Sequence, residues 1–164
     1  MEITIIVAID EQQAIGFKND QLAYISGDLK RFKQLTTGHT IVMGRKTFEA
    51  LPKGALPNRR NIVLTRNKKL KLTGCEIATT TKEVLNLCKN ENRLFVIGGG
   101  EIYKMFMPLA NQLLITHIHH SFKQADTWFP EIDYDSWELE KQEGPLTDEK
   151  NGLTYSYESL KRKN

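Results

Sequence analysis

One carboxylate, Asp28, stands at the start of a segment whose apolar residues recur at helical spacing. Phe32 and Leu35 follow it at i+4 and i+7, positions that share one face of an α-helix. A helix over Asp28–Leu35 would therefore turn this acid toward the same side as the apolar residues. Ser26 is the expected N-cap, and a negative charge in the first turn favours a helix, so a structural role alone would also explain an acid here.

Three turns that could bind phosphate follow three apolar runs. "TIVM" is followed by "GRKT" (Gly44–Thr47), "NIVL" by Thr65-Arg66, and "LFVI" by "GGGEIY" (Gly98–Tyr103). Glycine lets the backbone approach an anion, while Arg, Lys and Thr side chains donate hydrogen bonds to it. Each turn alone could be a tight turn or an ordinary helix start, since none matches G-x-G-x-x-G or a Walker A loop. Together they indicate one extended anion with several phosphates.

The pair His117 and His119 in "THIHH" would share one face of a strand. Two histidines could form part of a metal site, but such sites need at least a third protein ligand, and the sequence suggests none. We therefore expect no metal.

Strands that alternate with helices would position these residues. Apolar, β-branched runs indicate strands buried on both faces, and the segments between them have helical spacing. This order predicts an α/β fold with a mostly parallel sheet, in which ligands bind at the carboxyl ends of the strands. The predicted strands are Ile3–Ile9, Thr40–Met43, Asn61–Thr65 and Leu94–Ile97, and the predicted helices are Asp28–Leu35, Lys46–Leu51, Lys82–Cys88 and Glu101–Met107.

The pattern changes after "LLITHI" (Leu113–Ile118). "WELEKQE" and "LTYSYESL" alternate around a loop expected to contain Gly144, Pro145, Asn151 and Gly152, which predicts a closing antiparallel hairpin. No repeat, low-complexity linker or break in composition divides the chain, so residues 1–164 are expected to form a single domain.

The composition argues against several classes of partner. With 23 basic and 20 acidic residues the net charge is only +3, so neither nucleic acid nor a membrane surface is an expected partner. Cys75 and Cys88 belong to no C-x-x-C pattern, which fits a reducing compartment. The opening "MEITIIVAID" is too short for a membrane span and lacks the basic start of a signal peptide. We therefore expect a cytoplasmic protein that binds an anionic small molecule.

An ordered set of motifs resembles bacterial dihydrofolate reductase. The resemblance covers essentially the whole chain and implies a mixed, mostly parallel eight-stranded sheet flanked by four helices, with a closing antiparallel hairpin. It implies a monomer that reduces 7,8-dihydrofolate to tetrahydrofolate with NADPH, supports one-carbon and thymidylate metabolism, and binds antifolate inhibitors. The motifs are "AIGFKND", "DLKRFK", "VMGRKTFEALP", "NRRNIVLT", "VIGGGEIY", "LLITHI" and "DTWFPEID".

The resemblance assigns roles at the substrate end of the site. Asp28 matches the acid that binds the pterin through its N3 hydrogen and 2-amino group, and Thr116 matches the threonine that hydrogen-bonds this acid. Arg59 matches the arginine that grips the glutamyl carboxylate, while Arg60 should point to the other face of the strand. The implied pocket walls are Ile6, Val7, Ala8, Leu29, Phe32, Leu51 and Ile97, any of which would equally suit an ordinary core.

The resemblance also assigns a cofactor site and a catalytic group formed by Asp28 and Tyr103. The adenosine side is implied for Gly44, Arg45, Lys46, Thr47, Leu64, Thr65 and Arg66, of which Arg45, Thr65 and Arg66 are candidates for the 2′-phosphate. The pyrophosphate and nicotinamide side is implied for Gly98, Gly99, Gly100, Glu101, Ile102 and Tyr103, with a cis peptide at Gly98-Gly99, and for Ala8, Ile15, Gly16 and Thr127.

The implied chemistry is hydride transfer from nicotinamide C4 to pterin C6, with a water delivering a proton to N5. A loop from about Glu11 to Tyr24 would close over the nicotinamide. The chain departs from the family at two places, because Leu22-Ala23 in this loop stands where Pro-Trp is usual and Ser26-Gly27, before Asp28, replaces a common Pro-x. Tyr24 could partly refill the space of the missing indole.

Two other functions compete with this interpretation. One is the NADPH-dependent pyrimidine reductase of riboflavin synthesis, which would not need the pair Asp28 and Arg59. The other is a catalytically weakened relative that still binds NADPH and pterin, for which Leu22-Ala23 is the only support.

Overall fold

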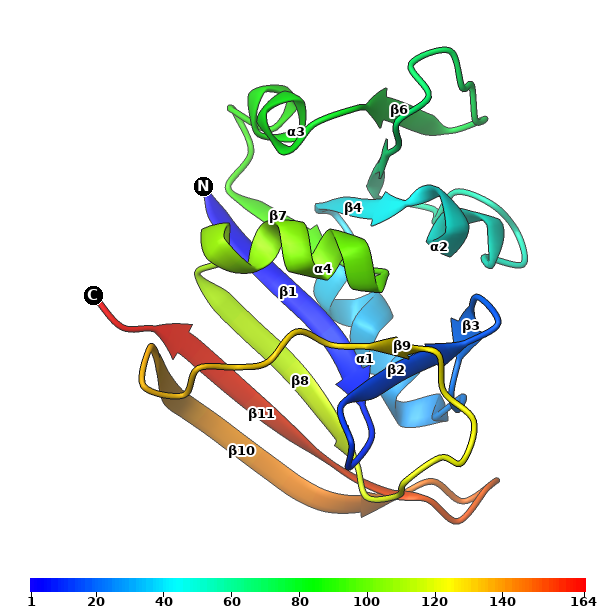
Figure 1. Ribbon diagram of the computed structural model, residues 1–164, viewed down its shortest axis with the longest axis vertical. Coiled ribbons are helices and arrows are strands. Elements are labelled where there is room, and N and C mark those ends of the chain that lie inside the picture. The colour runs from blue at the N-terminus through cyan, green and yellow to red at the C-terminus, as the bar shows by residue number, and fades with distance from the viewer.

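A twisted eight-stranded sheet runs through the centre of the protein (Figure 1). The structure is a computed structural model that describes residues 1–164. In spatial order the strands are β10 (Trp137–Thr147), β11 (Thr154–Arg162), β8 (Gln112–Ile118), β1 (Glu2–Ile9), β7 (Arg93–Val96), β4 (Thr40–Gly44), β5 (Arg60–Leu64) and β6 (Cys75–Ala78). The predicted eight-stranded sheet is confirmed.

The strand directions make the sheet mixed. From β8 to β6 every neighbouring pair is parallel, whereas β11 is antiparallel to both β8 and β10. In the register, Thr116 of β8 lies opposite Ala8 of β1 on one side and Tyr157 of β11 on the other. The parallel strands therefore present their carboxyl ends at one common edge.

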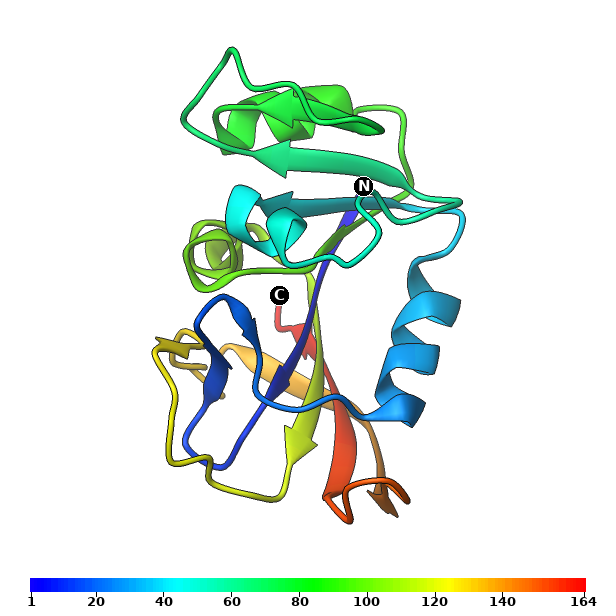
Figure 2. The same ribbon diagram turned by 90° about the vertical axis from the view of Figure 1, so that its right-hand side faces the viewer.

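Helices cover both faces of the sheet. They are α1 (Ser26–Thr36), α2 (Arg45–Glu49), α3 (Thr81–Leu87) and α4 (Gly100–Phe106), followed by a short 3₁₀ turn at Met107–Leu109. Figure 2 shows α1 on one face and α4 on the other. Successive residues of β1 serve the two layers: Ile5 and Val7 pack in the cluster that contains Phe106 of α4, and Ile6 packs in the cluster that Phe32 of α1 covers. None of the helices has the length and apolar character needed to cross a membrane.

A second, three-stranded sheet was not predicted. It consists of β2 (Ala14–Phe17), β3 (Asp20–Gln21) and β9 (Thr127–Trp128) in the order β3-β2-β9, beside the end of β1 (Figure 1). These strands have only two to four residues, too few for a recognisable alternation of polar and apolar residues. The loop expected over Glu11–Tyr24 thus contains two strands, and we call residues 11–24 the lid segment.

The predicted N-cap of α1 was wrong. Ser26 is the first helical residue, and the N-cap position belongs to Ile25, whose side chain makes no capping bond. The Ser26 N–H instead donates to Oδ1 of Asp148, 3.1 Å away, in the turn between β10 and β11. A carboxylate distant in sequence therefore replaces the local cap.

Two further predictions about strands need correction. Gly144 and Pro145 lie inside β10 rather than in the hairpin loop, at a register shift between Glu143 and Leu146. Proline is tolerated there because β10 is an edge strand and the shift interrupts the ladder. Strand β6 was missed because its sequence, "CEIA", is short and half-exposed.

Candidate active site

A cavity of about 1830 Å³ opens at the carboxyl edge of the parallel strands. Helix α1, the lid segment and the turn before α4 border it. Every residue that the sequence predicted for substrate, cofactor or catalysis lines this cavity, so the fold brings them into one site. They are Ile6, Val7, Ala8, Ile15, Gly16, Asp28, Leu29, Phe32, Gly44, Arg45, Lys46, Thr47, Leu51, Arg59, Leu64, Thr65, Arg66, Ile97, Gly98, Gly99, Gly100, Glu101, Ile102, Tyr103, Thr116 and Thr127.

Asp28 is half-buried in this cavity, on the first turn of α1. Its Oδ1 accepts a 2.6 Å hydrogen bond from the hydroxyl of Thr116, a buried residue of β8. Burial raises the pKa of Asp28, while the bond from Thr116 and the positive charge of Arg31 oppose that rise. Because Oδ2 has no protein partner, the carboxylate can accept further hydrogen bonds from a ligand.

Tyr103 of α4 lines the same cavity, but its hydroxyl is already engaged. It donates a 2.8 Å hydrogen bond to the carbonyl of Ile6, and its ring packs edge-on against Phe129. Burial, and then the negative charge of Asp28, raise the pKa of this phenol far above its ordinary value. Tyr103 is therefore a fixed, neutral wall that ties α4 to β1.

Sequence reasoning missed two aromatic residues of β11 that stand behind α1. The hydroxyl oxygen of Tyr155 lies 2.5 Å from where a Cβ on Gly27 would be, which explains the glycine before Asp28. The guanidinium of Arg31 lies over the ring of Tyr157, 4.0 Å from its centroid. Arg31 follows Asp28 by three residues and could have been noticed from that spacing.

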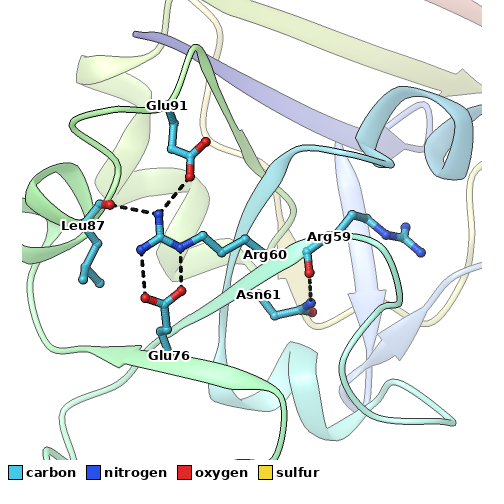
Figure 3. Close-up of polar contacts among 6 residues, drawn as sticks. All are labelled: Arg59, Arg60, Asn61, Glu76, Leu87 and Glu91. Atoms are coloured by element: carbon cyan, nitrogen blue, oxygen red, sulfur yellow. Dashed lines mark hydrogen bonds and ion pairs between the residues drawn. The ribbon is translucent and has the colours of Figure 1, made fainter.

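Arg59, which precedes β5, and Arg60, the first residue of β5, point in opposite directions (Figure 3). Arg59 lines the cavity, where its Nη1 donates to the hydroxyl of Thr36 at 3.1 Å. Arg60 forms a fork with Glu76, with distances of 2.5 and 2.8 Å, and also contacts Glu91. The prediction that Arg60 points to the other face is confirmed.

The turn before α4 approaches the end of β4 closely. Its Gly98-Gly99 peptide is cis, as predicted, and the Gly98 carbonyl accepts a 2.9 Å hydrogen bond from the Gly44 N–H. A Cβ on Gly100 would lie 2.8 Å from the Thr127 methyl carbon, so a side chain there would displace a neighbour. Three glycines thus leave the backbone of this turn open to the cavity.

The basic residues beside this turn have few protein partners. Arg45 pairs with Glu49 at 2.7 Å, one turn along α2, and both side chains are about half exposed. Arg66 forms no ion pair within the protein, and the Thr65 hydroxyl only accepts a long bond from the Asn67 N–H. These donors can therefore turn toward an anion at little cost.

The lid segment is attached to Asp126, the residue before β9. The Lys18 N–H donates to Asp126 at 2.9 Å, and the Asp126 N–H donates to the Gly16 carbonyl at 3.0 Å. Tyr24, at the end of the segment, hydrogen-bonds the Asp20 carboxylate and remains half-exposed. Tyr24 also lines the cavity.

His117 belongs to another part of the surface. Its Nε2 lies 3.0 Å from a carboxylate oxygen of Glu158, and no group of three or more His, Cys, Asp or Glu side chains is arranged to hold a metal ion.

Comparison with known proteins gives a consistent result. The family described as dihydrofolate reductase matches residues 2–162. The chain is 40% identical to a dihydrofolate reductase of Staphylococcus haemolyticus, over 99% of this chain and 96% of the relative. It is 41% identical to one of Bacillus subtilis, over 99% and 95%. The solved dihydrofolate reductase of Enterococcus faecalis, complexed with NADP(H) and RAB-propyl, superposes with a TM-score of 0.93 at 35% identity, covering 99% of this chain and 97% of that one.

Proposed function

The chain belongs to the dihydrofolate reductase family and reduces dihydrofolate with NADPH, and we propose that Asp28 is the residue that binds the pterin of this substrate. The contact of Asp28 with Thr116 inside the cavity carries the proposal, because it leaves Oδ2 open to the ligand. A carboxylate offers two acceptors in a fork to a pair of donors, here the pterin N3 hydrogen and 2-amino group.

The walls beside Asp28 suit the rest of the substrate. Ile6, Phe32 and Ile97 supply apolar surface of the kind that binds flat rings. Arg59 lies on the same side of the sheet and would bind the glutamyl carboxylate, for which its planar guanidinium is well suited. The carboxylate and the guanidinium would thus hold opposite ends of one extended molecule.

In this enzyme the chain's own residues would orient the substrate and exclude water. NADPH, when bound, supplies a hydride from nicotinamide C4 to pterin C6, and N5 gains a proton. Asp28 would hold the pyrimidine edge, away from N5, so a water delivers that proton. Tyr103 and the lid segment would wall the reacting ring from bulk solvent. Tyr103 would act by position, since its hydroxyl is bound to the Ile6 carbonyl.

The cofactor end of the cavity fits an extended phosphate ester. The glycine turn at Gly98–Gly100 leaves room for a pyrophosphate against the backbone. Arg45, Thr65 and Arg66 supply guanidinium and hydroxyl donors at the ends of two neighbouring strands, where a 2′-phosphate would distinguish NADPH from NADH. The remaining cofactor contacts are assigned to Ala8, Ile15, Gly16, Lys46, Thr47, Leu64, Glu101, Ile102 and Thr127.

The test compares NADPH consumption with and without dihydrofolate in the wild type and in Asp28→Asn. The amide presents one acceptor and one donor to two ligand donors, so turnover should fall by at least about a hundredfold while NADPH binding changes little. Asp135→Asn, an exposed aspartate outside the cavity, is the control and should retain full activity. Equal turnover in wild type and Asp28→Asn would refute the assignment. A chain that binds NADPH without consuming it would be a weakened relative.

The enzyme would act as a single-domain monomer in the cytoplasm. One continuous sheet from β10 to β6 supports the single domain. Both cysteines, Cys75 and Cys88, are free thiols, as expected in a reducing compartment. Light scattering would reveal a monomer or contradict it.

A further inference from the structure

Arg31 occupies a position beside Asp28 that neither the fold nor the reaction explains. Both residues line the cavity from α1. The Arg31 guanidinium carbon lies 4.0 Å from the centre of the Tyr157 ring. Its acidic neighbours are Asp28 and Glu143, which lies opposite Tyr157 on β10, and neither is within ion-pair distance of it. An arginine on an aromatic face keeps its in-plane N–H donors and its charge directed outward. The side chain is thus held in place without a direct ion pair.

The sheet register puts Tyr157, which carries Arg31 on its ring, next to Asp28. Tyr157 lies opposite Thr116 in the pairing of β11 with β8, and Thr116 donates to Asp28. The titratable and charged groups around Asp28 are Arg31 from its own helix, Tyr157 from β11 and Tyr103 from α4. Burial keeps both phenols protonated by raising their pKa values. Arg31 is therefore the positive charge that accompanies Asp28 at neutral pH.

We propose that Arg31, held on the face of Tyr157, is a specificity-determining residue that favours neutral pterins over cationic ligands at Asp28. The inference rests on the proposed function, in which Asp28 binds the pyrimidine edge of the substrate. A neutral dihydropterin meets Arg31 without repulsion. A 2,4-diaminopyrimidine that is protonated on its ring nitrogen brings a second positive charge to the same carboxylate, and the two like charges repel each other.

The same charge also favours the ionised form of the acid. Burial raises the pKa of Asp28, and Arg31 acts with Thr116 against that rise. Removing a positive charge should raise the pKa of any acid in the pocket, whether it is the Asp28 carboxyl or a protonated pterin nitrogen. Loss of the Arg31 charge should therefore raise the pKa that limits the reaction, whichever of the two groups that pKa belongs to.

The experiment compares Arg31→Gln with Lys30→Gln. Lys30 is the preceding residue, is exposed and does not line the cavity, so both variants lose one charge from α1. Binding would be measured by calorimetry for 2,4-diamino-5-benzylpyrimidine and for 6,7-dimethyl-7,8-dihydropterin, which has no glutamyl tail to contact an arginine. Arg31→Gln should tighten the diaminopyrimidine about three- to tenfold and change the dihydropterin less than about twofold. Lys30→Gln should change neither.

Variants of Tyr157 provide an independent check. Tyr157→Leu removes the aromatic face and should shift the ratio of the two affinities as Arg31→Gln does, whereas Tyr157→Phe keeps the face and should preserve the wild-type ratio. Titration of Asp28 by carbonyl NMR should show a higher pKa in Arg31→Gln and in Tyr157→Leu. An unchanged affinity ratio in Arg31→Gln, or an equal change in Lys30→Gln, would overturn the proposal.

Asp28→Asn distinguishes a failure of the proposal for Arg31 from a failure of the function proposed for Asp28. If it weakens both ligands while Arg31→Gln leaves their ratio unchanged, the inference about Arg31 fails and the function proposed for Asp28 stands. If Asp28→Asn weakens neither ligand, the function proposed for Asp28 fails, and the inference about Arg31 fails with it.

Discussion

Asp28 is subject to two opposing demands. A binding site needs its carboxylate ionised in a half-apolar cavity, and folding is disfavoured by burying that charge. Thr116 and Arg31 compensate only partly, because the net effect on the pKa of Asp28 is upward. Residues of this kind exchange stability for function.

This opposition predicts how stability depends on pH. Since the folded pKa lies above the ordinary value of 3.8, the folded state holds its proton more tightly than the unfolded state. Below pH 3.8 the Asp28 carboxyl is protonated in both states and costs no stability. As the pH rises through the folded pKa, the buried carboxylate ionises and the free energy of unfolding falls. Asp28→Asn, which carries no charge, should raise the melting temperature at pH 7 by a few degrees.

Thermal melts of the wild type and Asp28→Asn between pH 4 and pH 8 would measure this difference. The gain should shrink toward pH 4 and be constant well above the folded pKa. The exposed Asp135→Asn should show no such trend. A gain that is equal at every pH would contradict the argument.

Arg45 and Arg66 are expected to determine which nicotinamide cofactor is used. Replacing both with Ala should lower the ratio of kcat/KM for NADPH to kcat/KM for NADH at least about tenfold, because each lost guanidinium–phosphate contact is worth about 1.5–3 kcal/mol. Breaking the Arg45–Glu49 pair should itself matter little, since it is an exposed i,i+4 pair. Steady-state kinetics with both cofactors would measure the ratio.

A double variant that loses the same charge elsewhere is the control for this prediction. Lys123→Ala with Lys161→Ala removes two exposed cations outside the cavity and should leave the ratio unchanged. If Arg45→Ala with Arg66→Ala does the same, neither arginine selects the cofactor.

The sequence identified the residues that carry recognisable chemistry but not those that position them. Asp28 and the glycine turn could be found because their types and spacing differ from ordinary core or surface, whereas Arg59 was assigned only through the resemblance to the family. Tyr157 could not, since an aromatic residue in an alternating strand is typical of any β-hairpin. Its importance depends on the pairing of β11 with β8, which is a contact between distant segments.

Helix α1 shows how elements depend on distant partners. Its apolar stripe predicted its position, and the helix is two residues longer at its start than the stripe alone indicated. The residue that binds its first N–H is Asp148, which is 4% exposed and also accepts from the Asn151 N–H. No local rule relates Ser26 to a turn more than a hundred residues later, so the wrong cap was chosen.

Asp148 is therefore expected to support both the helix and the site. Asp148→Ala removes a capping acceptor and should lower stability by about 0.5–2 kcal/mol. Because Asp28 is in the first turn of the same helix, KM for dihydrofolate should rise several-fold, while NADPH affinity, which depends on the other end of the cavity, should change less than about twofold. Urea unfolding and steady-state kinetics would measure the two effects.

Asp148→Asn keeps one oxygen acceptor, which can serve the Ser26 N–H, but its amide group would face the Asn151 N–H. It should therefore restore KM for dihydrofolate and only part of the stability. If Asp148→Ala lowers stability without changing KM for dihydrofolate, the turn supports the fold alone.

On the scale of the whole molecule, the sheet directs the side chains of neighbouring residues to different sites. Arg59 and Arg60 are adjacent at the start of β5, but Arg59 lines the cavity and Arg60 points the other way (Figure 3). Arg60 binds Glu76 of β6, the carbonyl of Leu87 at the end of α3, and Glu91 in the turn before β7. One side chain thus joins three segments at the start of β5, on the same side of the sheet as Thr65 and Arg66, which follow the other end of this strand.

Arg60→Met should therefore destabilise the protein and weaken NADPH binding more than dihydrofolate binding. The methionine keeps the apolar stem but leaves Glu76, Glu91 and the Leu87 carbonyl without their shared donor. Since these groups are partly exposed, with 32% of the Arg60 side chain accessible, water would compensate in part and the loss should be about 1–3 kcal/mol. Arg93→Met is the matched control, since it removes one surface pair with Glu2 at 3.1 Å and a contact over the Phe95 ring but joins no third segment. It should cost about 1 kcal/mol or less. Urea unfolding with and without NADPH would compare the two variants. Only a residue that joins several segments should contribute more than one exposed ion pair does. Equal losses of stability in the two variants would therefore show that Arg60 is an ordinary surface arginine.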